Sequence, residues 1–324
     1  MYSALQILDK VNEAIAELNY TRQPVGLYAP IEYVLSLGGK RVRPVLMLMA
    51  YNLYKDSFDD VMSQALAMET YHNYTLLHDD LMDRSDRRRG MPTVHVKWDE
   101  NTAILSGDAM LVLAYRLLGE GASDKLNEIL ALFTQTALEI CEGQQYDMEF
   151  ETRDDVTEGE YMEMIRLKTS VLLAASLKMG ALLGGASCED ADALYEFGIQ
   201  LGLAFQLKDD FLDVYGDPAV FGKNLGGDIL CCKKTYMLIK ALERATEVQR
   251  EDLMGWLHNK ICRPDEKIAA VTQLYTEIGV KKVCENKMRE YYGNALMTLS
   301  NVSVADDRKQ ELRSFAERLM NREI

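Results

Sequence analysis

The chain has 324 residues, of which 48% are hydrophobic, so it can bury a sizeable core and is not intrinsically disordered. Its 36 Lys and Arg against 51 Asp and Glu give a net charge of −15, which argues against nucleic acid as a partner because the phosphate backbone attracts positive proteins. The six cysteines show neither the density of a disulfide framework nor CxxC spacing. No apolar run of about eighteen residues predicts a membrane span, and the N-terminus does not resemble a signal peptide. We therefore expect a cytoplasmic protein with no membrane span.

Helical periodicity dominates the chain. Apolar residues recur every three or four positions over 4–18, 162–183 and 191–211, and no proline lies between Pro92 and Pro218, which predicts long helices rather than sheet. Breaks between helices are predicted at 22–30, 38–44, 87–92, 119–124, 184–190, 216–227 and 263–265. The prediction is an all-α fold with short connections, forming one domain over residues 1–324.

Two aspartate clusters share the pattern DDxxD. The segments HDDLMD and QLKDDFLD contribute Asp79, Asp80, Asp83, Asp209, Asp210 and Asp213. Residues four apart stack on one helix face, where carboxylates repel by about 3 kcal/mol per pair at ~5 Å and an effective dielectric near ~20. One such cluster in an acidic chain is typical of a hydrated helix face. Because both copies follow apolar helical runs, the pair predicts two sets of ligands that could clamp a diphosphate through Mg2+.

Three basic clusters lie close to the aspartates or in a glycine turn. The segments GGKRVRP, DRRRGMPTVH and GKNLGGDILCCKKT contribute Lys40, Arg41, Arg43, Arg87, Arg88, Arg89, Lys223, Lys233 and Lys234. Arginine forks suit phosphate oxygens, and glycines allow close backbone approach to an anion. Each cluster alone is typical of a solvated loop, but their placement beside the carboxylates indicates a phosphate site. No P-loop, GxGxxG, HExxH or GxSxG motif competes with this interpretation.

The order of the motifs provides a further clue. GGKRVRP, DDLMD, RRGMPTVH, GQQYD, LKTS, FQLKDD with FLD, and GKNLGGDI followed by KKT run co-linearly from Gly38 to Thr235. In this the chain resembles the trans-type polyprenyl diphosphate synthases, which include farnesyl and geranylgeranyl diphosphate synthases. The resemblance implies long helices around a deep central cavity, a homodimer, and head-to-tail condensation of isopentenyl diphosphate with an allylic diphosphate.

The resemblance also implies roles for individual residues. The six aspartates would hold Mg2+, three ions per active site, against the allylic diphosphate. The side chains that would contact that diphosphate are Arg88, Lys168, Lys223 and Lys233. Those of the isopentenyl diphosphate site would be Lys40, Arg43, His72 and Arg89. Thr169 and Gln206 resemble the polar pair that faces the developing carbocation.

Product length is expected to depend on bulk just before the first aspartate cluster. Tyr74 lies five residues before Asp79, about 7.5 Å back along a helix, and its neighbour Thr75 is smaller. An aromatic floor there predicts products of fifteen to twenty carbons, whereas the alternative is that Tyr74 only packs between helices. Cys232 departs from the glycine usual before the KKT lysines.

Other functions share parts of this pattern. A class I terpene cyclase has the same fold and one DDxxD cluster but needs no second prenyl site, which GGKRVRP and the second cluster indicate here. A non-catalytic partner subunit of a synthase tends to lose carboxylates, and both clusters are complete. A helical metal-binding scaffold would release no diphosphate from any prenyl substrate.

Overall fold

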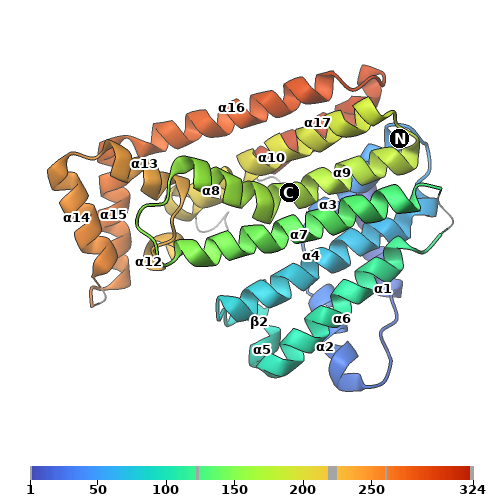
Figure 1. Cartoon of the computed structure of the whole chain (residues 1–324), viewed down its shortest axis with the longest axis horizontal. Helices are drawn as coiled ribbons and strands as arrows, with labels where there is room; N and C mark the ends of the chain where they lie inside the picture. Colours follow the sequence, from blue (N-terminus) through green and yellow to red (C-terminus); the bar gives the residue numbers. More distant parts are fainter. Residues whose placement is uncertain (1, 122–123, 218–224, 260, 322–324) are drawn as a thin grey trace.

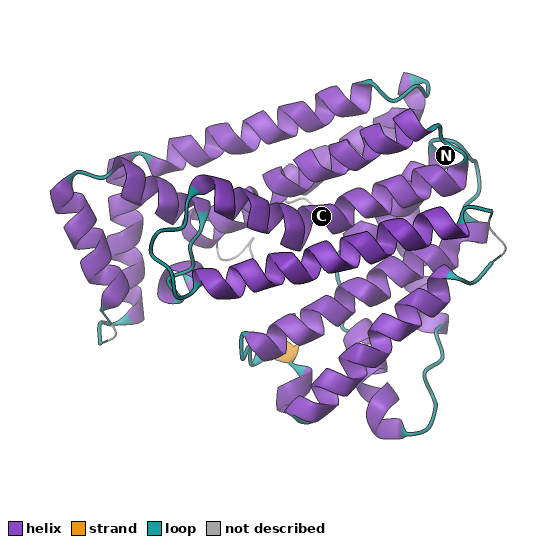
Figure 2. Ribbon diagram, viewed as in Figure 1, coloured by secondary structure: helices purple, strands orange, loops and turns teal. Residues whose placement is uncertain are grey.

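The computed structural model describes residues 2–121, 124–217, 225–259 and 261–321. Almost all regular structure in them is helical, as predicted (Figure 2). The first helices are α1 (Ala4–Glu17), α2 (Val25–Ser36), α3 (Val42–Asn52), the 3-10 turn η1 (Asp59–Val61), α4 (Met62–Met82), α5 (Val94–Lys97), α6 (Glu100–Leu118) and α7 (Leu126–Phe150). They are followed by α8 (Glu158–Ile165), the π-helix η2 (Arg166–Ser170), α9 (Val171–Gly184), α10 (Cys188–Tyr215), α12 (Gly227–Leu230), α13 (Tyr236–Arg244), α14 (Glu247–His258), α15 (Pro264–Ile278), α16 (Val280–Ser300) and α17 (Asp306–Asn321).

The long helices run side by side along the long axis of the molecule (Figure 1). In that view α16, α10, α9, α7 and α4 form neighbouring rods, and α14 and α15 stand crosswise at one end. The carboxyl ends of α4, α7 and α10 all point toward that end. Of these helices, α4 and α10 carry the two aspartate clusters close to those ends.

Local sequence explains where the helices begin. Ser187 caps α10 by accepting from the backbone N–H of Asp190 at 3.1 Å, and Thr157 and Glu160 form a reciprocal capping box at the start of α8. Such caps satisfy backbone donors that the first turn leaves unpaired. Pro264 opens α15 at a position where its missing N–H costs nothing.

Close helix packing at the centre depends on small residues. A Cβ added at Gly198 of α10 would lie 2.4 Å from the Ala174 Cα of α9, closer than any real contact. Since every residue of α9 except Lys178 and Leu183 is buried, these two helices form the middle layer of the core. That position gives α10 a rigid support for the aspartates near its end.

Several predicted breaks reach into helices, since those over 38–44 and 184–190 overlap the first residues of α3 and α10. The break over 22–30 is wrong in its second half, because α2 begins at Val25 and contains Pro30. Pro30, Ile31, Val34 and Leu35 are buried, and tertiary packing of this face stabilises a helix that proline alone would weaken. The break over 87–92 contains a short antiparallel hairpin, β1 (Arg87–Arg88) with β2 (Met91–Pro92).

One helical stretch is long and apolar enough to cross a membrane, which the sequence analysis did not anticipate. It covers Glu158–Gly184, with a mean hydropathy of 1.3 in its most apolar window. However, 78% of that window is buried inside the protein. Burial of this extent is typical of a core helix in a bundle.

Candidate active site

The first aspartate cluster lies at the carboxyl end of α4. Asp79 and Asp80 are in its last turn and Asp83 is its C-cap. The chain then turns through Arg84, whose N–H donates to the Leu81 carbonyl oxygen at 3.2 Å, while Ser85 N–H donates to that of Asp80 at 2.9 Å. This pair of bonds is a Schellman motif. It ends the helix directly after the third aspartate.

Asp80 is turned into the protein rather than toward an open site. Its Oδ2 accepts from Arg88 Nε at 2.7 Å, and the residue is 5% exposed. Burial raises the pKa of Asp80 although Arg88 opposes the change. Arg88 Nη2 also lies 3.6 Å from Asp79 Oδ2, so one guanidinium joins both carboxylates.

Lys168 links the first cluster to α7. Its Nζ donates to Asp79 Oδ1 at 3.1 Å and to Asp147 Oδ2 at 2.6 Å. Burial disfavours the ammonium, but the two carboxylates outweigh burial and raise the pKa of Lys168. Burial and the charge of Asp79 raise the pKa of Asp83, as expected for a carboxylate beside a like charge.

A π-helix presents Lys168 and Thr169. The segment Arg166–Ser170 interrupts the helical run between α8 and α9, and such bulges re-aim side chains at functional sites. Gly143 of α7 faces it so closely that an added Cβ would lie 2.4 Å from the Lys168 nitrogen. The glycine of the GQQYD segment therefore allows the lysine backbone to approach α7.

The second cluster lies near the carboxyl end of α10, where Asp210 is a buried anchor. Asp210 accepts from the Tyr161 hydroxyl and, through Oδ1, from Gln206 Nε2 at 2.9 Å. Thr169 Oγ1 in turn donates to Gln206 Oε1 at 3.0 Å. Burial and then Asp228 raise the pKa of Asp210 well above its usual value. The predicted pair Thr169 and Gln206 is thus brought together and held in one orientation.

The remaining members of the cluster face the loop after α10. Asp213 accepts from the backbone N–H groups of Gly227 and Asp228 at 3.1 and 3.0 Å, which anchors α12. Asp209 lies half-buried on α10. Predicted Lys223 lies outside the described residues.

Lys233 lies in the electrostatic field of the first aspartate cluster. Burial disfavours its charge, but four carboxylates raise its pKa: Asp147, Asp228, Asp83 and Asp79. Asp79 and Asp83 belong to the first cluster, and Asp228 also raises the pKa of Asp210 in the second. Carboxylates with cationic side chains beside them are an arrangement suited to an anion bound through cations.

The predicted isopentenyl diphosphate residues form a second, basic group. Arg43 Nη1 lies 3.0 Å from His72 Nε2, and Arg89 Nη1 donates to the Gly38 carbonyl oxygen. Burial, followed by Arg43 and Arg89, lowers the pKa of His72 well below its usual value. Since arginine can only donate, the neutral ring accepts through Nε2. Lys40 is exposed in the same turn.

The predicted chain-length residues lie farther back along α4. Tyr74 is half-buried between the rings of Tyr71 and His78, with centroid distances of 5.4 and 4.8 Å. Thr75 Oγ1 donates to the carbonyl oxygen of His72 at 2.8 Å. Tyr74 thus belongs to an aromatic row on α4, one turn before the aspartates.

The donor set fits a hard cation. The aspartates offer oxygen ligands, and Asp80 Oδ1 is a buried acceptor without a hydrogen-bond partner. Among the described residues no three His, Cys, Asp or Glu side chains converge closely enough to hold a metal ion by themselves. Ions at Asp79, Asp83 or Asp209 would therefore be completed by water and phosphate oxygens, as Mg2+ commonly is.

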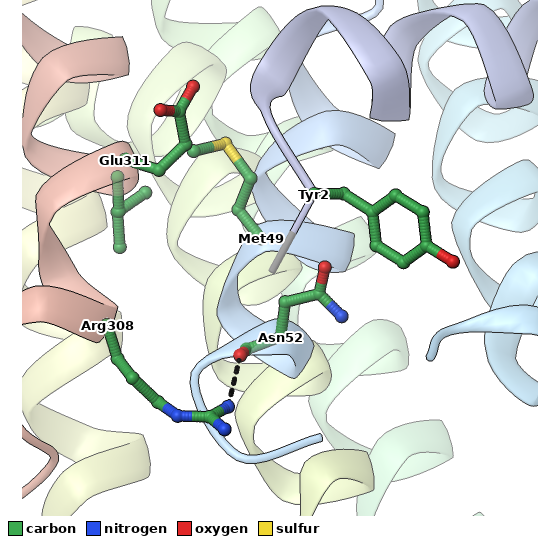
Figure 3. Close-up of a pocket in the computed structure, with 6 residues that line it drawn as sticks. Tyr2, Met49, Asn52, Arg308 and Glu311 are labelled. Atoms are coloured by element: carbon green, nitrogen blue, oxygen red, sulfur yellow. Dashed lines mark hydrogen bonds between the residues drawn. The ribbon is translucent and has the colours of Figure 1, made fainter. Parts of the chain in front are cut away.

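A small pocket elsewhere has no part in this arrangement. It lies between the N-terminus, α3 and α17 (Figure 3), with a volume of about 10 Å³, and is lined by Tyr2, Met49, Asn52, Arg308, Glu311 and Leu312. That volume holds at most about one water molecule.

Backbone strain is concentrated around the site. Four non-glycine residues of the described chain have left-handed φ: Arg41 (48°), Arg84 (52°), Arg89 (52°) and Cys232 (55°). All lie in or beside the predicted basic and acidic motifs. Cys232, which departs from the glycine expected there, adopts a left-handed conformation that glycine takes without strain.

Comparison with known proteins shows the family of the chain. The sequence profile described as "Polyprenyl synthetase" matches residues 24–278. This chain belongs to the polyprenyl synthetase family. It is 44% identical over 247 residues to a geranylgeranyl diphosphate synthase of Methanosarcina mazei, covering 76% of this chain and 75% of that protein.

Solved structures of the family share the whole fold. A crystal structure of geranylgeranyl pyrophosphate synthase superposes with a TM-score of 0.95 at 43% identity, over 99% of both chains. A second, from Corynebacterium glutamicum in complex with isoprenyl diphosphate and magnesium, gives a TM-score of 0.84 at 29% identity, over 98% of this chain and 96% of that one. The all-α prediction is confirmed.

Sequence reasoning missed several residues of the site. Asp147 ends the GQQYD segment and was recognised only as part of a motif, while Tyr161 and Glu69 lie in ordinary helical periodicity. An acid that ends a glycine-containing helical segment is the one signal that could have identified Asp147. Tyr161 and Glu69 carry no local signal, because their partners lie 49 and 28 residues away.

Proposed function

We propose that this chain is a short-chain trans-prenyltransferase that condenses isopentenyl diphosphate with an allylic diphosphate, head to tail. The observation that carries the proposal is that the neighbours Lys168 and Thr169 reach both aspartate clusters, Asp79 directly and Asp210 through Gln206, beside a separate arginine group at Arg43 and Arg89. The reaction needs two diphosphate sites, one for the allylic diphosphate that leaves and one for the diphosphate that stays on the product. A terpene cyclase would need only the first.

The allylic diphosphate would bind between the two clusters. The predicted Mg2+ ligands, for three ions per site, are the six aspartates Asp79, Asp80, Asp83, Asp209, Asp210 and Asp213, and the unpartnered Asp80 Oδ1 supports this role. When bound, the ions neutralise charge that develops on the leaving diphosphate. The magnesium complex of the Corynebacterium relative supports this choice of metal.

The chain's own residues assist the same bond cleavage. Arg88, Lys168 and Lys233 would donate to the departing diphosphate oxygens, and carboxylates hold Arg88 and Lys168 in place before substrate arrives. Such preorganised donors stabilise the transition state because they need not reorient. Lys223 has the same proposed role from the motif.

Thr169 and Gln206 would face the carbon that becomes positive. The Thr169 hydroxyl donates a hydrogen bond to Gln206 Oε1, which leaves the lone pairs of the hydroxyl oxygen available to a cation. The Gln206 amide is in turn fixed by Asp210. The isopentenyl double bond then attacks the allylic carbon, and the proton lost afterwards would pass to the departed diphosphate, since neither residue is a base.

The second substrate would be held by the basic group. Lys40, Arg43, His72 and Arg89 would bind the diphosphate of isopentenyl diphosphate, where His72 contributes its Nδ1–H because Nε2 faces Arg43. This diphosphate is not released in the reaction, so arginines can bind it without a metal.

Product length, assembly and location complete the proposal. Tyr74 with its neighbour Thr75 would stop growth at fifteen to twenty carbons. The chain would act as a single domain within a homodimer, supported by exposed apolar residues on one face of α6, Leu105 and Val112 at 60% and 67% exposure. A reducing, cytoplasmic setting is supported by six free cysteines.

The deciding experiment is incubation with isopentenyl diphosphate and dimethylallyl, geranyl or farnesyl diphosphate plus Mg2+, followed by chain-length analysis. We expect condensation products of fifteen to twenty carbons. Diphosphate release from an allylic substrate alone, with cyclic products, would instead indicate a cyclase. Absence of turnover with every pair would overturn the proposal.

A further inference from the structure

A buried ion pair lies beneath the basic group. Arg41 Nη1 donates to Glu69 Oε1 at 2.6 Å, and the two side chains are 3% and 2% exposed. Asn73 Nδ2 donates to the same oxygen at 2.8 Å, and Arg41 Nη2 donates to the Leu35 carbonyl oxygen at 2.7 Å. Because both charged groups are enclosed, neither can contact a substrate directly.

The pair controls the shape of the glycine-rich turn. Arg41 lies between Lys40 and Arg43 and is the N-cap of α3, with left-handed φ. Its guanidinium bonds to the last turn of α2 and to α4, so three helices meet at one side chain. Left-handed backbone is unfavourable for a residue with a Cβ and persists where surrounding contacts enforce it.

Glu69 also counteracts repulsion among the arginines. Burial lowers the pKa of Arg43 to about 10, and the charge of Glu69 opposes that change. Burial and then Arg41 lower the pKa of Arg89, which Glu69 again opposes. The carboxylate therefore helps to keep several cations together before any diphosphate arrives.

We propose that Glu69 and Arg41 are positioning residues for the isopentenyl diphosphate subsite, which hold Lys40 and Arg43 in place. The inference rests on the proposed function, since it takes Lys40 and Arg43 to bind the diphosphate of isopentenyl diphosphate. Glu69 acts only through Arg41 and the turn.

Two effects of removing Glu69 oppose each other. Loss of an anion makes the local potential more positive, which favours a diphosphate. However, it leaves Arg41 buried without its charged partner, which is strongly unfavourable, so the turn must rearrange. The second effect acts at 2.6 Å between two buried side chains and should outweigh the first.

The test compares Glu69→Gln and Arg41→Lys with the wild-type protein. Steady-state kinetics give kcat and the KM of each substrate, and calorimetry gives the Kd of isopentenyl diphosphate without metal. We expect the KM and Kd of isopentenyl diphosphate to rise about tenfold, the scale of one lost charge-assisted hydrogen bond. The KM of the allylic diphosphate should change less than about threefold, because its proposed ligands do not touch this pair.

Asp190→Asn is the matched control. Asp190 is another buried carboxylate, 5% exposed, that accepts from Tyr54 and Ser303 at the opposite end of α10. It should lower the melting temperature without altering either KM. A general loss of stability is thereby separated from a positioning effect.

The outcomes are distinct. An unchanged or lower Kd in Glu69→Gln, or an equal rise in both KM values, would overturn the inference. If Glu69→Gln does not fold, Glu69→Asp replaces it, because it retains the charge at a shorter reach. The Kd of isopentenyl diphosphate should then rise by less than about tenfold, and an unchanged Kd would overturn the inference. Wild-type binding without turnover would refute the proposed function while the Kd ratio still tests Glu69, and no wild-type binding would refute both.

Discussion

At the scale of single residues, several charged side chains of the site already have a partner within the protein. Lys168 holds Asp79 and Asp147, Arg88 holds Asp80, and Arg43 meets a neutral His72. Most of these pairs join residues far apart in sequence, so each one locks a helix end in place. Preorganisation of this kind reduces what must be rearranged on binding.

His72 should make stability depend on pH. Its pKa is lowered in the folded state by burial and by the surrounding arginines, Arg43, Arg89, Arg88 and Arg41. As pH falls below about 6.5, His72 binds a proton in the unfolded chain but not in the folded one. The free energy of unfolding therefore falls, by about 1 kcal/mol over one pH unit. Urea unfolding of wild type and His72→Gln between neutral and mildly acidic pH checks this: the variant should show a shallower loss, and parallel curves would contradict it.

Tyr74 should limit product length. Replacing it with Ala removes a ring packed between Tyr71 and His78, and chromatography of the products should then show chains longer than those of the wild type. The matched control is Tyr292→Ala on distant α16, which should leave the product length unchanged. Unaltered chain length in Tyr74→Ala would mean that the ring only packs between helices.

At the scale of elements, the π-helix and α7 form a unit that aims Lys168. The bulge is tolerated because Gly143 leaves space for the Lys168 backbone. Neither partner works alone: the bulge presents the lysine, and the glycine permits the approach.

Gly143→Ala should therefore disturb catalysis and stability together. The new methyl group would lie 2.4 Å from the Lys168 nitrogen, and overpacking of this kind costs about 1–3 kcal/mol. We expect a lower melting temperature and a fall in kcat of about tenfold, the equivalent of ~1.4 kcal/mol in the barrier. Gly293→Ala on α16 is the control, since nothing lies within 4 Å of its added Cβ; it should stabilise the protein slightly and retain full activity.

At the scale of the whole molecule, helices and motifs were predictable from the sequence, whereas contacts between distant segments of the chain were not. Periodicity and proline spacing predict α1, α9 and α10 because burial of one stripe determines both pattern and fold. Both DDxxD segments could be recognised because their spacing is local. The Arg41–Glu69 pair, the π-helix and the reach of Lys168 to Asp147 depend on packing between distant segments, which no local pattern encodes. Packing also decides the structure at Pro30, where burial stabilises a helix although the local sequence predicts a break.

The apolar face of α6 should form the homodimer contact. Leu105 and Val112 lie two turns apart on it, and a groove of about 360 Å³ lined by Tyr28 and Arg116 adjoins Val112. Val112→Glu should convert a dimer to a monomer in sedimentation velocity, because a charge at the centre of an apolar contact has no partner. Val248→Glu on α14, equally exposed at 68%, should remain dimeric; a wild-type monomer would contradict the proposal.

The Schellman turn after Asp83 has a consequence for engineering. Arg84 holds a left-handed conformation that glycine adopts without penalty, and its exposed side chain has no proposed role in the reaction. Arg84→Gly should thus raise the free energy of unfolding by about 1 kcal/mol, measured by urea titration, with turnover preserved. At Arg41, Arg89 and Cys232 the same exchange would relax the backbone but also delete a side-chain contact, so Arg84 is the one of these four bends where the gain in stability carries no such loss.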